Sequence, residues 1–417
     1  MNINYLTEPI VTILDNPRDI HLYKLENVIC TGLSLYYPNV LLLSKNNDKL
    51  YLPYNEKSMS FNRKTIYEEK DMKFEVCNKN IDNVVTTPVF FFIYNVENYY
   101  HFIYDTLPYL YYYFEVKNTI PECKLLIQTH SVNTTLFKFV KETLELLNIH
   151  DLEFVKENTL YSTVYVSSSL THQDKSNEPP NKQAFYIYEK CINEALNSCN
   201  TLFPIEKMYV SRRTYLHNDT SNIGTNYTQR RVLKEETEIV EYLNTLNFKE
   251  VFPECWTMRE KIYYFSNAKV IVGLIGGGMC NLLFSNNNTK SLVICSPYFL
   301  DINYRFKYSM EHTQIKYIKD TSVEYSIYPY AKYQRVKLKD GKYAEIIDVI
   351  KENDPRTNEP VILKCMLGSE TSVSILCSNN IITVNSKDVN LIDNGLNSPF
   401  TLDITSIYKF KDWLNIE

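Results

Sequence analysis

Residues 269–297 read KVIVGLIGGGMCNLLFSNNNTKSLVICSP, and they show the fold of the chain most clearly. The apolar runs Lys269–Leu274 and Ser291–Pro297 have the length of buried strands. The chain has only 9 glycines, yet four of them fall within six positions: Gly273 near the end of the first run, and Gly276, Gly277 and Gly278 just after it. The stretch therefore predicts a buried strand, a glycine turn opening a short helix, and a second buried strand.

The same alternation of apolar strands and amphipathic helices extends upstream in two successive series. Continuous apolar strands between helices are typical of a parallel sheet with helices on its faces. The helix predicted over Ala184–Asn197 is a plausible crossover between the series. The strands of the two series are predicted over Pro88–Tyr94, Cys123–Thr129 and Leu160–Ser167, then Met208–Arg212 and Phe248–Phe252, and the helices over Asn98–Val116, Thr135–Ile149, 235–247 and 257–268.

Two such series predict an α/β protein with two Rossmann-like domains that face a cleft. We expect a first domain over residues 1–203, with small strands in its first 87 residues, and a second over residues 204–329. From residue 330 to 417 the pattern changes to short β segments, with the hairpin pair Asp340-Gly341 between two of them. This part is expected to be a small appended β-rich segment.

Composition excludes several classes of protein. Hydrophobic residues make up 44% and charged residues 22% of 417 residues, which is ordinary for a globular protein. The net charge is −5 with scattered Lys and Arg, so we expect no nucleic-acid partner. The aromatic stretch over residues 90–114 is interrupted by charged residues and by Pro108, which argues against a membrane span.

The remaining composition bears on location and origin. The 10 cysteines form no CxxC pair and have no metal-ligand spacing, which favours reduced thiols in a cytoplasm. The first residues have neither a basic region nor an apolar run typical of an export signal. The 35 tyrosines, with abundant Asn, Ile and Lys, suggest an AT-rich genome such as that of a bacterium or a large DNA virus.

The glycine cluster predicts a phosphate site. Backbone amides at a helix N-terminus attract anions, and glycine lets a phosphate approach closely. Tight packing of strand on helix is the alternative explanation for the glycines. The spacing does not fit the dinucleotide pattern G-x-G-x-x-G, which disfavours a dehydrogenase, and no Gly-Lys-Ser/Thr of a P-loop follows. A nucleotide-sugar site remains.

Two basic segments are further candidates for binding phosphate. Ser211–Arg213 lies at the end of a predicted strand, and Gln229–Arg231 precedes the next helix. Ligands bind at the carboxyl ends of strands in open α/β sheets, and guanidinium groups match phosphate oxygens. Arg212 and Arg231 are therefore predicted to bind a diphosphate, with a solvated basic loop as the alternative.

The first domain offers a candidate base. Asn98, His101 and Asp105 share one face of the predicted helix, whose other positions are mainly apolar or aromatic. An imidazole oriented by a carboxylate can deprotonate an acceptor hydroxyl. In the alternative, the pair satisfies itself or caps neighbouring backbone in an aromatic core.

Three ordered motifs resemble those of glycosyltransferase family 61, which includes xylosyl-, arabinosyl- and N-acetylglucosaminyltransferases. The first is NYYHFIYDTLP (Asn98–Pro108), for the family pattern N-Y-x-H-F-x-x-D-x-L-P. The second is SRR (Ser211–Arg213) followed by RRVLKE (Arg230–Glu235). The third is VFPE (Val251–Glu254) followed by GLIGGGMCNLLF (Gly273–Phe284). Ile275 stands where the family usually has His, and Lys234 where it usually has Asn.

The resemblance implies a GT-B fold and an inverting transfer of a sugar from a nucleoside diphosphate sugar to a hydroxyl of a glycan or glycoprotein. The sugar would be xylose, another pentose or N-acetylglucosamine. No metal and no further cofactor is expected, because arginines and the helix dipole can stabilise the leaving diphosphate. A catalytically decayed carbohydrate-binding or assembly protein on this scaffold is the alternative. The expected roles are catalysis by His101 and Asp105, an acceptor-side Asn98, and donor binding by Arg212, Arg213, Arg231, Glu254, Gly276, Gly277, Gly278, Met279, Cys280 and Asn281.

Overall fold

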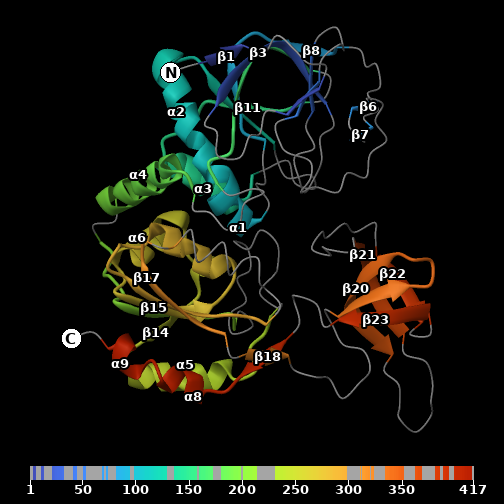
Figure 1. Ribbon diagram of the computed structural model, residues 1–417. Helices are drawn as coiled ribbons and strands as arrows, with labels where there is room; N and C mark the ends of the chain where they lie inside the picture. Colours follow the sequence, from blue (N-terminus) through green and yellow to red (C-terminus); the bar gives the residue numbers. More distant parts are fainter. Residues whose placement is uncertain are drawn as a thin grey trace.

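The computed structural model describes residues 3–5, 11–13, 21–31, 41–44, 50–52, 68–69, 72–73, 81–93, 98–128, 136–156, 159–171, 180–198, 201–213, 231–297, 310, 312–319, 321–323, 334–351, 362–368, 381–385, 388–393 and 399–415. These residues form two stacked α/β units and a separate antiparallel sheet beside them (Figure 1). Both predicted α/β series are present.

The first unit is built on a ten-stranded sheet with a parallel part in the order β11-β10-β9-β12. Strand β9 lies between β10 and β12, so the chain reverses its direction of winding at β9. The earlier strands extend the sheet from the antiparallel partner of β12, which is β3. The bounds are β1 (Ile3–Tyr5), β2 (Val11–Ile13), β3 (Leu22–Thr31), β4 (Leu41–Ser44), β5 (Leu50–Leu52), β8 (Asn83–Val85), β9 (Val89–Phe91), β10 (Lys124–Ile127), β11 (Leu152–Phe154) and β12 (Thr159–Ser167).

The helix predicted over Asn98–Val116 is not one α-helix. It divides into α1 (Tyr99–His101), a π-turn (Phe102–Thr106), a 3-10 turn (Leu107–Tyr109) and α2 (Leu110–Thr119). Pro108 explains the break, because proline has no N–H to donate and its ring clashes with the carbonyl four residues earlier. The helical backbone widens to a π-turn before Pro108 and tightens to a 3-10 turn around it. Two regular helices complete the unit, α3 (Lys138–Leu146) and α4 (Lys182–Ser198).

The second unit is a five-stranded, all-parallel sheet in the order β14-β13-β15-β16-β17. The chain moves outward from β13 to β14 and then returns to the other side of β13 with β15, so the winding reverses between β13 and β15. The predicted strands and helices are confirmed here. They are β13 (Lys207–Val210), α5 (Glu236–Thr245), β14 (Lys249–Val251), α6 (Met258–Asn267), β15 (Val270–Leu274) and β16 (Lys290–Ile294). The edge strand β17 (Gln314–Ile318) lies in a segment for which the sequence predicted no strand.

The two units share one hydrophobic core. It contains Phe139 and Tyr188 from the first unit together with Met258 and Phe284 from the second. Tyr188 packs edge-on against Phe284, with 5.8 Å between ring centroids. Helices α3 and α4 thus lie against α6 where the units meet (Figure 1).

The predicted β-rich segment contains an antiparallel sheet in the order β22-β21-β20-β19-β23, which has its own small core. The hairpin signal is confirmed, because β19 and β20 pair antiparallel around Asp340 and Gly341. One of the short β segments predicted in this part, Thr371–Cys377, lies outside the described residues. The strands are β19 (Arg335–Leu338), β20 (Tyr343–Lys351), β21 (Ile362–Gly368), β22 (Ile381–Asn385) and β23 (Val389–Asp393), and a two-stranded ribbon is formed by β6 (Glu68–Glu69) and β7 (Met72–Lys73).

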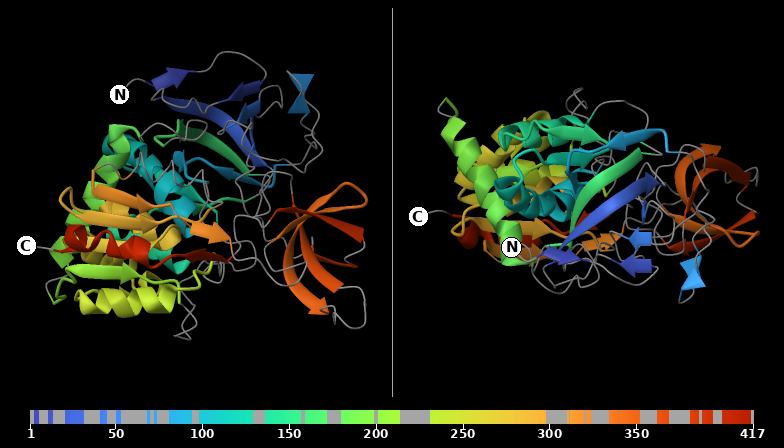
Figure 2. Two further views of the ribbon diagram at one scale, coloured as in Figure 1. Left: turned by 60° about the horizontal axis from the view of Figure 1, so that its bottom comes forward. Right: turned by 90° about the horizontal axis from the view of Figure 1, so that it is seen from above.

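The described residues after 398 leave this sheet and return to the second unit. Strand β24 (Phe400–Leu402) pairs with β18 (Thr321–Val323), and helices α8 (Thr405–Tyr408) and α9 (Lys411–Leu414) follow. Figure 2 shows the antiparallel sheet to one side, while the C-terminal helices lie along the second unit. The expected segment 330–417 thus consists of a separate sheet and a tail. The apolar side chains of this tail pack with those of α5 and the second sheet in a further core of the second unit.

Candidate functional site

The carboxyl edge of the second sheet gathers most of the predicted donor-side residues. Arg212 follows β13, Glu254 follows β14 in the short 3-10 turn Pro253–Cys255, and Gly276 follows β15. All three strands are parallel, so these ends lie at the same edge. The reversal of winding between β13 and β15 is also the position at which open α/β sheets bind ligands.

Gly276 brings two of the predicted arginines together. A side chain at this position would overlap Nη1 of Arg212, and its Cβ would lie 3.8 Å from Nη2 of Arg231. The backbone of Gly276 has φ 155° and ψ −170°, a region that is essentially restricted to glycine. Arg231 is also held in the left-handed region, with φ 54°. Its side chain is nearly buried. The two guanidinium groups therefore converge on the bare backbone of the turn.

Packing explains two of the other glycines, as the alternative reading anticipated. A Cβ on Gly273 would lie 2.6 Å from Sδ of Met279, and one on Gly278 would lie 3.0 Å from Cγ1 of Val210. The turn continues as a 3-10 helix over Gly277–Phe284, rather than as an α-helix. The side chains of Met279, Cys280 and Asn281 are fully buried beneath it. Within this segment, the half-buried Gly277 and Gly278 are the predicted donor residues whose backbone reaches the surface.

A buried carboxylate that the sequence did not single out anchors Arg212. Glu236, at the start of α5, accepts the backbone N–H of Arg212 at 2.7 Å and the hydroxyls of Tyr209 and Ser211 at 3.1 and 3.2 Å. Burial raises the pKa of Glu236, although these hydrogen bonds oppose the shift. The adjacent Glu235 instead accepts the N–H of Leu402. The acidic pair at the helix start was the available sequence signal.

Arg213 lies away from the glycine turn. Its guanidinium forms a fork with Glu250 on β14, with Nε–Oε1 at 2.9 Å and Nη2–Oε2 at 2.6 Å, and it also donates to Thr237. It ties β13 to its neighbour and is not brought together with Arg212 and Arg231. Gln229 and Arg230 lie outside the described residues. Ile275 is buried, and its N–H donates to the carbonyl of Ile294, so it continues the sheet.

The candidate base lies on the first unit. Nδ1 of His101 and Oδ2 of Asp105 are 2.6 Å apart, and both side chains are about three-tenths exposed. Asp105 belongs to the π-turn, so the irregular backbone places it. Asn98 has a structural role, because its side chain caps α1 by accepting the N–H of His101 at 3.3 Å. The structural alternative for this pair holds in part, because His101 and Asp105 do bond one another. Both side chains nevertheless remain accessible to solvent.

The two halves of the candidate site meet directly. The hydroxyl of Tyr99 in α1 donates to Oδ1 of Asn281 in the 3-10 helix, across 182 residues of sequence. The pKa of the Cys280 thiol is raised by burial and, next, by the charge of Asp105, so that carboxylate lies near the glycine-turn helix. Tyr99 lies within the motif Asn98–Pro108, but the sequence pattern predicts no role for it. The candidate base and the candidate phosphate turn are therefore neighbours.

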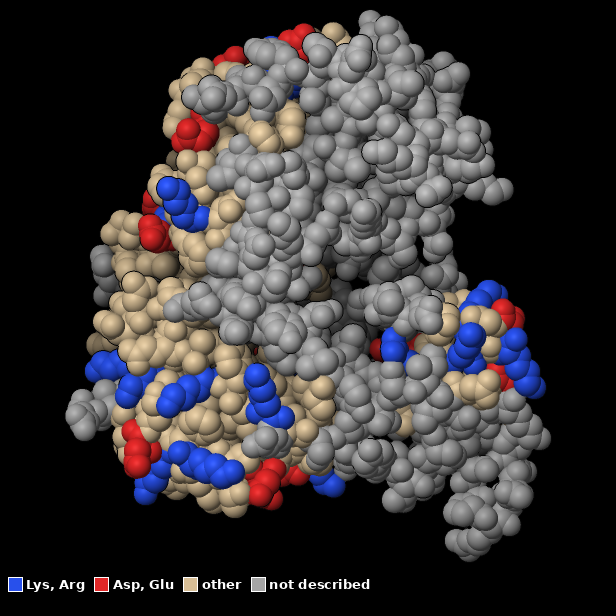
Figure 3. Space-filling model, viewed as in Figure 1, with Lys and Arg blue, Asp and Glu red and all other residues tan. Residues whose placement is uncertain are grey.

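The described surface carries mixed charge. Figure 3 shows Lys and Arg interspersed with Asp and Glu over the second unit and over the antiparallel sheet. Among the described residues, no three His, Cys, Asp or Glu side chains are grouped so that they could hold a metal ion. The helices within the described ranges are all too short or too polar to cross a bilayer. Six cysteines of the described ranges form no disulfide: Cys123, Cys191, Cys255, Cys280, Cys295 and Cys365.

Comparison with known proteins supports the assignment from motifs. The model of the glycosyltransferase 61 family matches residues 99–292, which run from α1 to β16 and include both halves of the site. The mixed α/β content with parallel sheets is consistent with a glycosyltransferase fold. No curated protein matches the chain.

Proposed function

Because residues 99–292 carry a glycosyltransferase 61 domain, which marks the protein as a glycosyltransferase, we propose that it transfers a sugar from a nucleoside diphosphate sugar to a hydroxyl of a glycan or glycoprotein, with inversion at the sugar. The sugar is a pentose such as xylose, or N-acetylglucosamine. The convergence of Arg212 and Arg231 on Gly276, in a turn whose Asn281 is bonded by Tyr99 from the helix start that carries His101 and Asp105, is the observation that carries the proposal.

In this proposal the two α/β units form a GT-B layout. Residues 1–203 bind the acceptor and residues 204–329 bind the donor, with the C-terminal tail completing the donor unit. The donor lies at the carboxyl edge of the second sheet, and the acceptor lies on the side of α1. The contact between Tyr99 and Asn281 supports this placement, because it joins the two sides at the site.

The donor side binds the diphosphate and stabilises it as it leaves. The guanidinium groups of Arg212 and Arg231 neutralise the charge that develops on the leaving phosphate oxygen. The half-buried Gly277 and Gly278 carry no side chain, so their backbone allows close approach of the phosphates. These groups supply the electrostatic stabilisation that many transferases obtain from a metal, so we propose that binding needs none. Glu254, in the short turn that follows β14, bonds a ribose or sugar hydroxyl.

The acceptor side supplies the base. Asp105 accepts the N–H at Nδ1 of His101, which leaves Nε2 free of its proton and able to take one from the acceptor hydroxyl. The acceptor oxygen bonds to the anomeric carbon while the bond from that carbon to the phosphate oxygen breaks, and the diphosphate leaves with the electron pair. A single displacement of this kind inverts the anomeric centre.

The decisive experiment screens nucleoside diphosphates and their sugars by thermal stabilisation, calorimetry and slow hydrolysis, in the presence of a chelator. We expect Arg212→Ala to weaken binding about tenfold or more, since losing a hydrogen bond to a charged group costs about 1.5–3 kcal/mol. Arg259→Ala is the matched control, because Arg259 is exposed on α6. Equal affinity in wild type and Arg212→Ala would refute the donor site, and binding only with a metal would refute the metal-free part.

The same screen separates transfer from mere binding. Asp105→Asn is expected to reduce transfer by roughly 100-fold, the usual scale for loss of a general base, with donor affinity unchanged. The control is Asp151→Asn, an exposed carboxylate paired with Lys117 in the same unit. Tight donor binding without any hydrolysis or transfer would favour the decayed binding protein instead.

A further inference from the structure

Lys261 is a buried charge at the junction of the two units. It lies in the first turn of α6 and is 3% exposed. Its ammonium group donates to Sδ of Met258 at 4.0 Å, and it lies 4.6 Å from the centre of the Tyr99 ring. A thioether is a weak acceptor, and burying a charged amine is expensive, so packing alone gives no reason for a lysine here.

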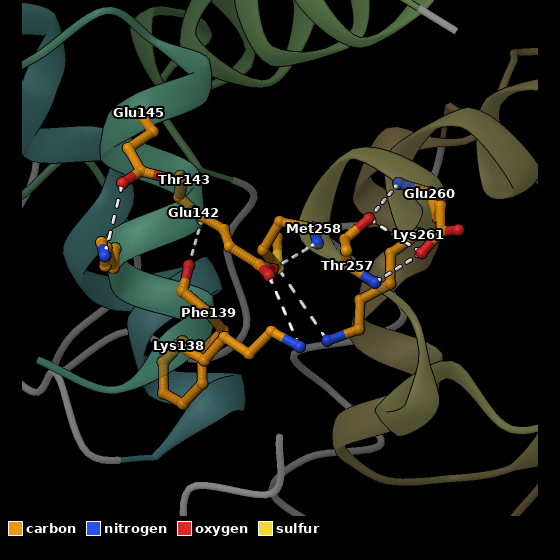
Figure 4. Close-up of polar contacts among 10 residues, drawn as sticks. Lys138, Phe139, Glu142, Thr143, Glu145, Thr257, Met258, Glu260 and Lys261 are labelled. Carbon is orange, nitrogen blue, oxygen red and sulfur yellow. Dashed lines mark hydrogen bonds and ion pairs between the residues drawn. The ribbon is translucent and has the colours of Figure 1, made fainter. Parts of the chain in front are cut away.

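The charged groups around Lys261 come from both units. On α3, Glu142 favours the charged amine and Lys138 opposes it, and beyond β14 Glu254 and the Cys255 thiol favour it. Burial outweighs all of them and lowers the pKa of Lys261 to about 8. Figure 4 shows Lys138 and Lys261 reaching towards one another beside Glu142, whose Oε2 accepts the N–H of Met258 at 2.8 Å.

Tyr99 connects this lysine to the glycine turn. Its ring accepts the ammonium on its face, and its hydroxyl donates to Oδ1 of Asn281 at 2.5 Å. The amide Nδ2 of the same Asn281 donates to the carbonyl of Gly278 at 2.9 Å. Asn281 is fully buried, so its orientation is fixed by these two partners. A continuous chain of contacts thus leads from Lys261 to the backbone of the turn.

We propose that Lys261 is a positioning residue: it holds Tyr99 from the first unit on Asn281 of the second, and Asn281 fixes the backbone of the glycine turn. A cation over the face of the ring is attracted by the ring quadrupole, and this attraction holds the Tyr99 ring in place. Adjacent glycines have many accessible conformations, so a fixed carbonyl at Gly278 reduces the entropy lost when a ligand binds. This inference rests on the proposed function, in which the turn binds the donor diphosphate.

The test uses three full-length variants. Lys261→Met removes the charge at similar length, Tyr99→Phe removes the hydroxyl but keeps the ring, and Lys269→Met is the matched control because Lys269 is exposed. Hydrogen exchange of the backbone amides over residues 276–282 is measured without ligand, followed by the dissociation constant of the nucleoside diphosphate that stabilises the wild type most. We expect Lys261→Met and Tyr99→Phe to exchange faster in this segment and to bind about five- to tenfold more weakly, the scale for ordering one or two groups.

A pH series distinguishes positioning from general packing. Wild-type affinity should fall as the pH rises through about 8, where Lys261 loses its proton, whereas Lys261→Met should be weak at every pH. Unchanged exchange at residues 276–282 in both variants overturns the positioning role whatever the ligand does. Faster exchange in the turn with unaltered ligand affinity, or with no ligand bound by the wild type, retains the positioning of the turn and refutes the proposed donor site.

Discussion

At the scale of single residues, Gly276 combines a backbone conformation that other residues avoid with a side-chain direction already filled by Arg212. We predict that Gly276→Ala abolishes nucleoside diphosphate binding, because the methyl group displaces Arg212 and the turn must change shape. Gly341→Ala is the control, since Gly341 also has positive φ, at 88°, but nothing lies within 4 Å of its Cβ direction. Calorimetry on both variants is the measurement. Retained binding in Gly276→Ala would contradict the convergence of arginines on this turn.

The buried Lys261 leads to a second prediction at this scale, which concerns the free energy of unfolding. Its pKa falls from 10.5 to about 8 on folding, so below pH 8 its burial costs roughly 3 kcal/mol, taking 1.36 kcal/mol per unit. Between pH 8 and 10.5 the unfolded chain keeps a proton that the folded chain has lost, so the contribution of Lys261 to the free energy of unfolding rises with pH.

Lys261→Met should therefore be more stable than wild type at pH 7, with a difference that shrinks towards pH 10. Denaturant unfolding at several pH values measures this, with Lys269→Met as the reference. A difference independent of pH would show that the lysine is not titrating in the folded core. Greater stability with weaker ligand binding in the same variant is the combination expected of a residue retained for function.

At the scale of an element, the broken helix of residues 99–119 is held by a partner on another helix. Pro108 removes the N–H that would have bonded the carbonyl of Tyr104, and the hydroxyl of Tyr188 on α4 approaches that carbonyl at 3.5 Å and bonds the carbonyl of Ile103 at 3.1 Å. Burial, the largest cause, raises the pKa of Tyr188 well above its ordinary range, so it remains a donor. The π-turn that places Asp105 thus depends on a buried hydroxyl.

We predict that Tyr188→Phe lowers the free energy of unfolding by about 1–3 kcal/mol, the cost of leaving a buried acceptor unsatisfied. Turnover should fall as well, because the π-turn that places Asp105 loses its support. Tyr186→Phe on the same helix is the control, since Tyr186 is half exposed. Denaturant unfolding and transfer assays on the two variants decide the matter. Equal free energies of unfolding in the two variants would mean that the π-turn does not depend on the hydroxyl of Tyr188.

At the scale of the whole molecule, the tail after residue 398 completes the second unit. The backbone of Phe400 exchanges hydrogen bonds with Val232 and Lys234 ahead of α5, and Tyr408 packs on Tyr242 with 4.5 Å between ring centroids. Phe400 itself is buried in the core of that unit. The unit therefore depends on chain segments separated by the entire antiparallel sheet.

Phe400→Ala should accordingly destabilise the protein by about 3–5 kcal/mol, as expected for a large aromatic side chain removed from a core. Phe203→Ala makes the same chemical change at a side chain that is 87% exposed, and its effect should stay within about 0.5 kcal/mol. Thermal and denaturant unfolding measure both. Similar small effects would show that the tail contributes little to the second core.

Local pattern was enough to predict the buried strands and regular helices of the two units and the glycine turn, although not strand β17 or the break of the helix at Pro108. Buried strands such as β15 are short apolar runs, and α6 begins at Thr257 with a capping box to Glu260, a signal contained in four residues. The sheet edge that carries Arg212 also follows from sequence, because parallel strands align their carboxyl ends. These features depend on neighbours in the chain, which is why the sequence by itself determined them.

Tertiary structure alone decided which of the predicted side chains meet. Arg212 reaches Gly276 while its neighbour Arg213 turns to Glu250, since adjacent residues leaving a strand face opposite sides. The selection of Glu236 over Glu235 and the burial of Lys261 beneath Tyr99 also depend on contacts between distant segments. No periodicity encodes such pairs, because their partners lie tens to hundreds of residues apart and come together only when the two units pack.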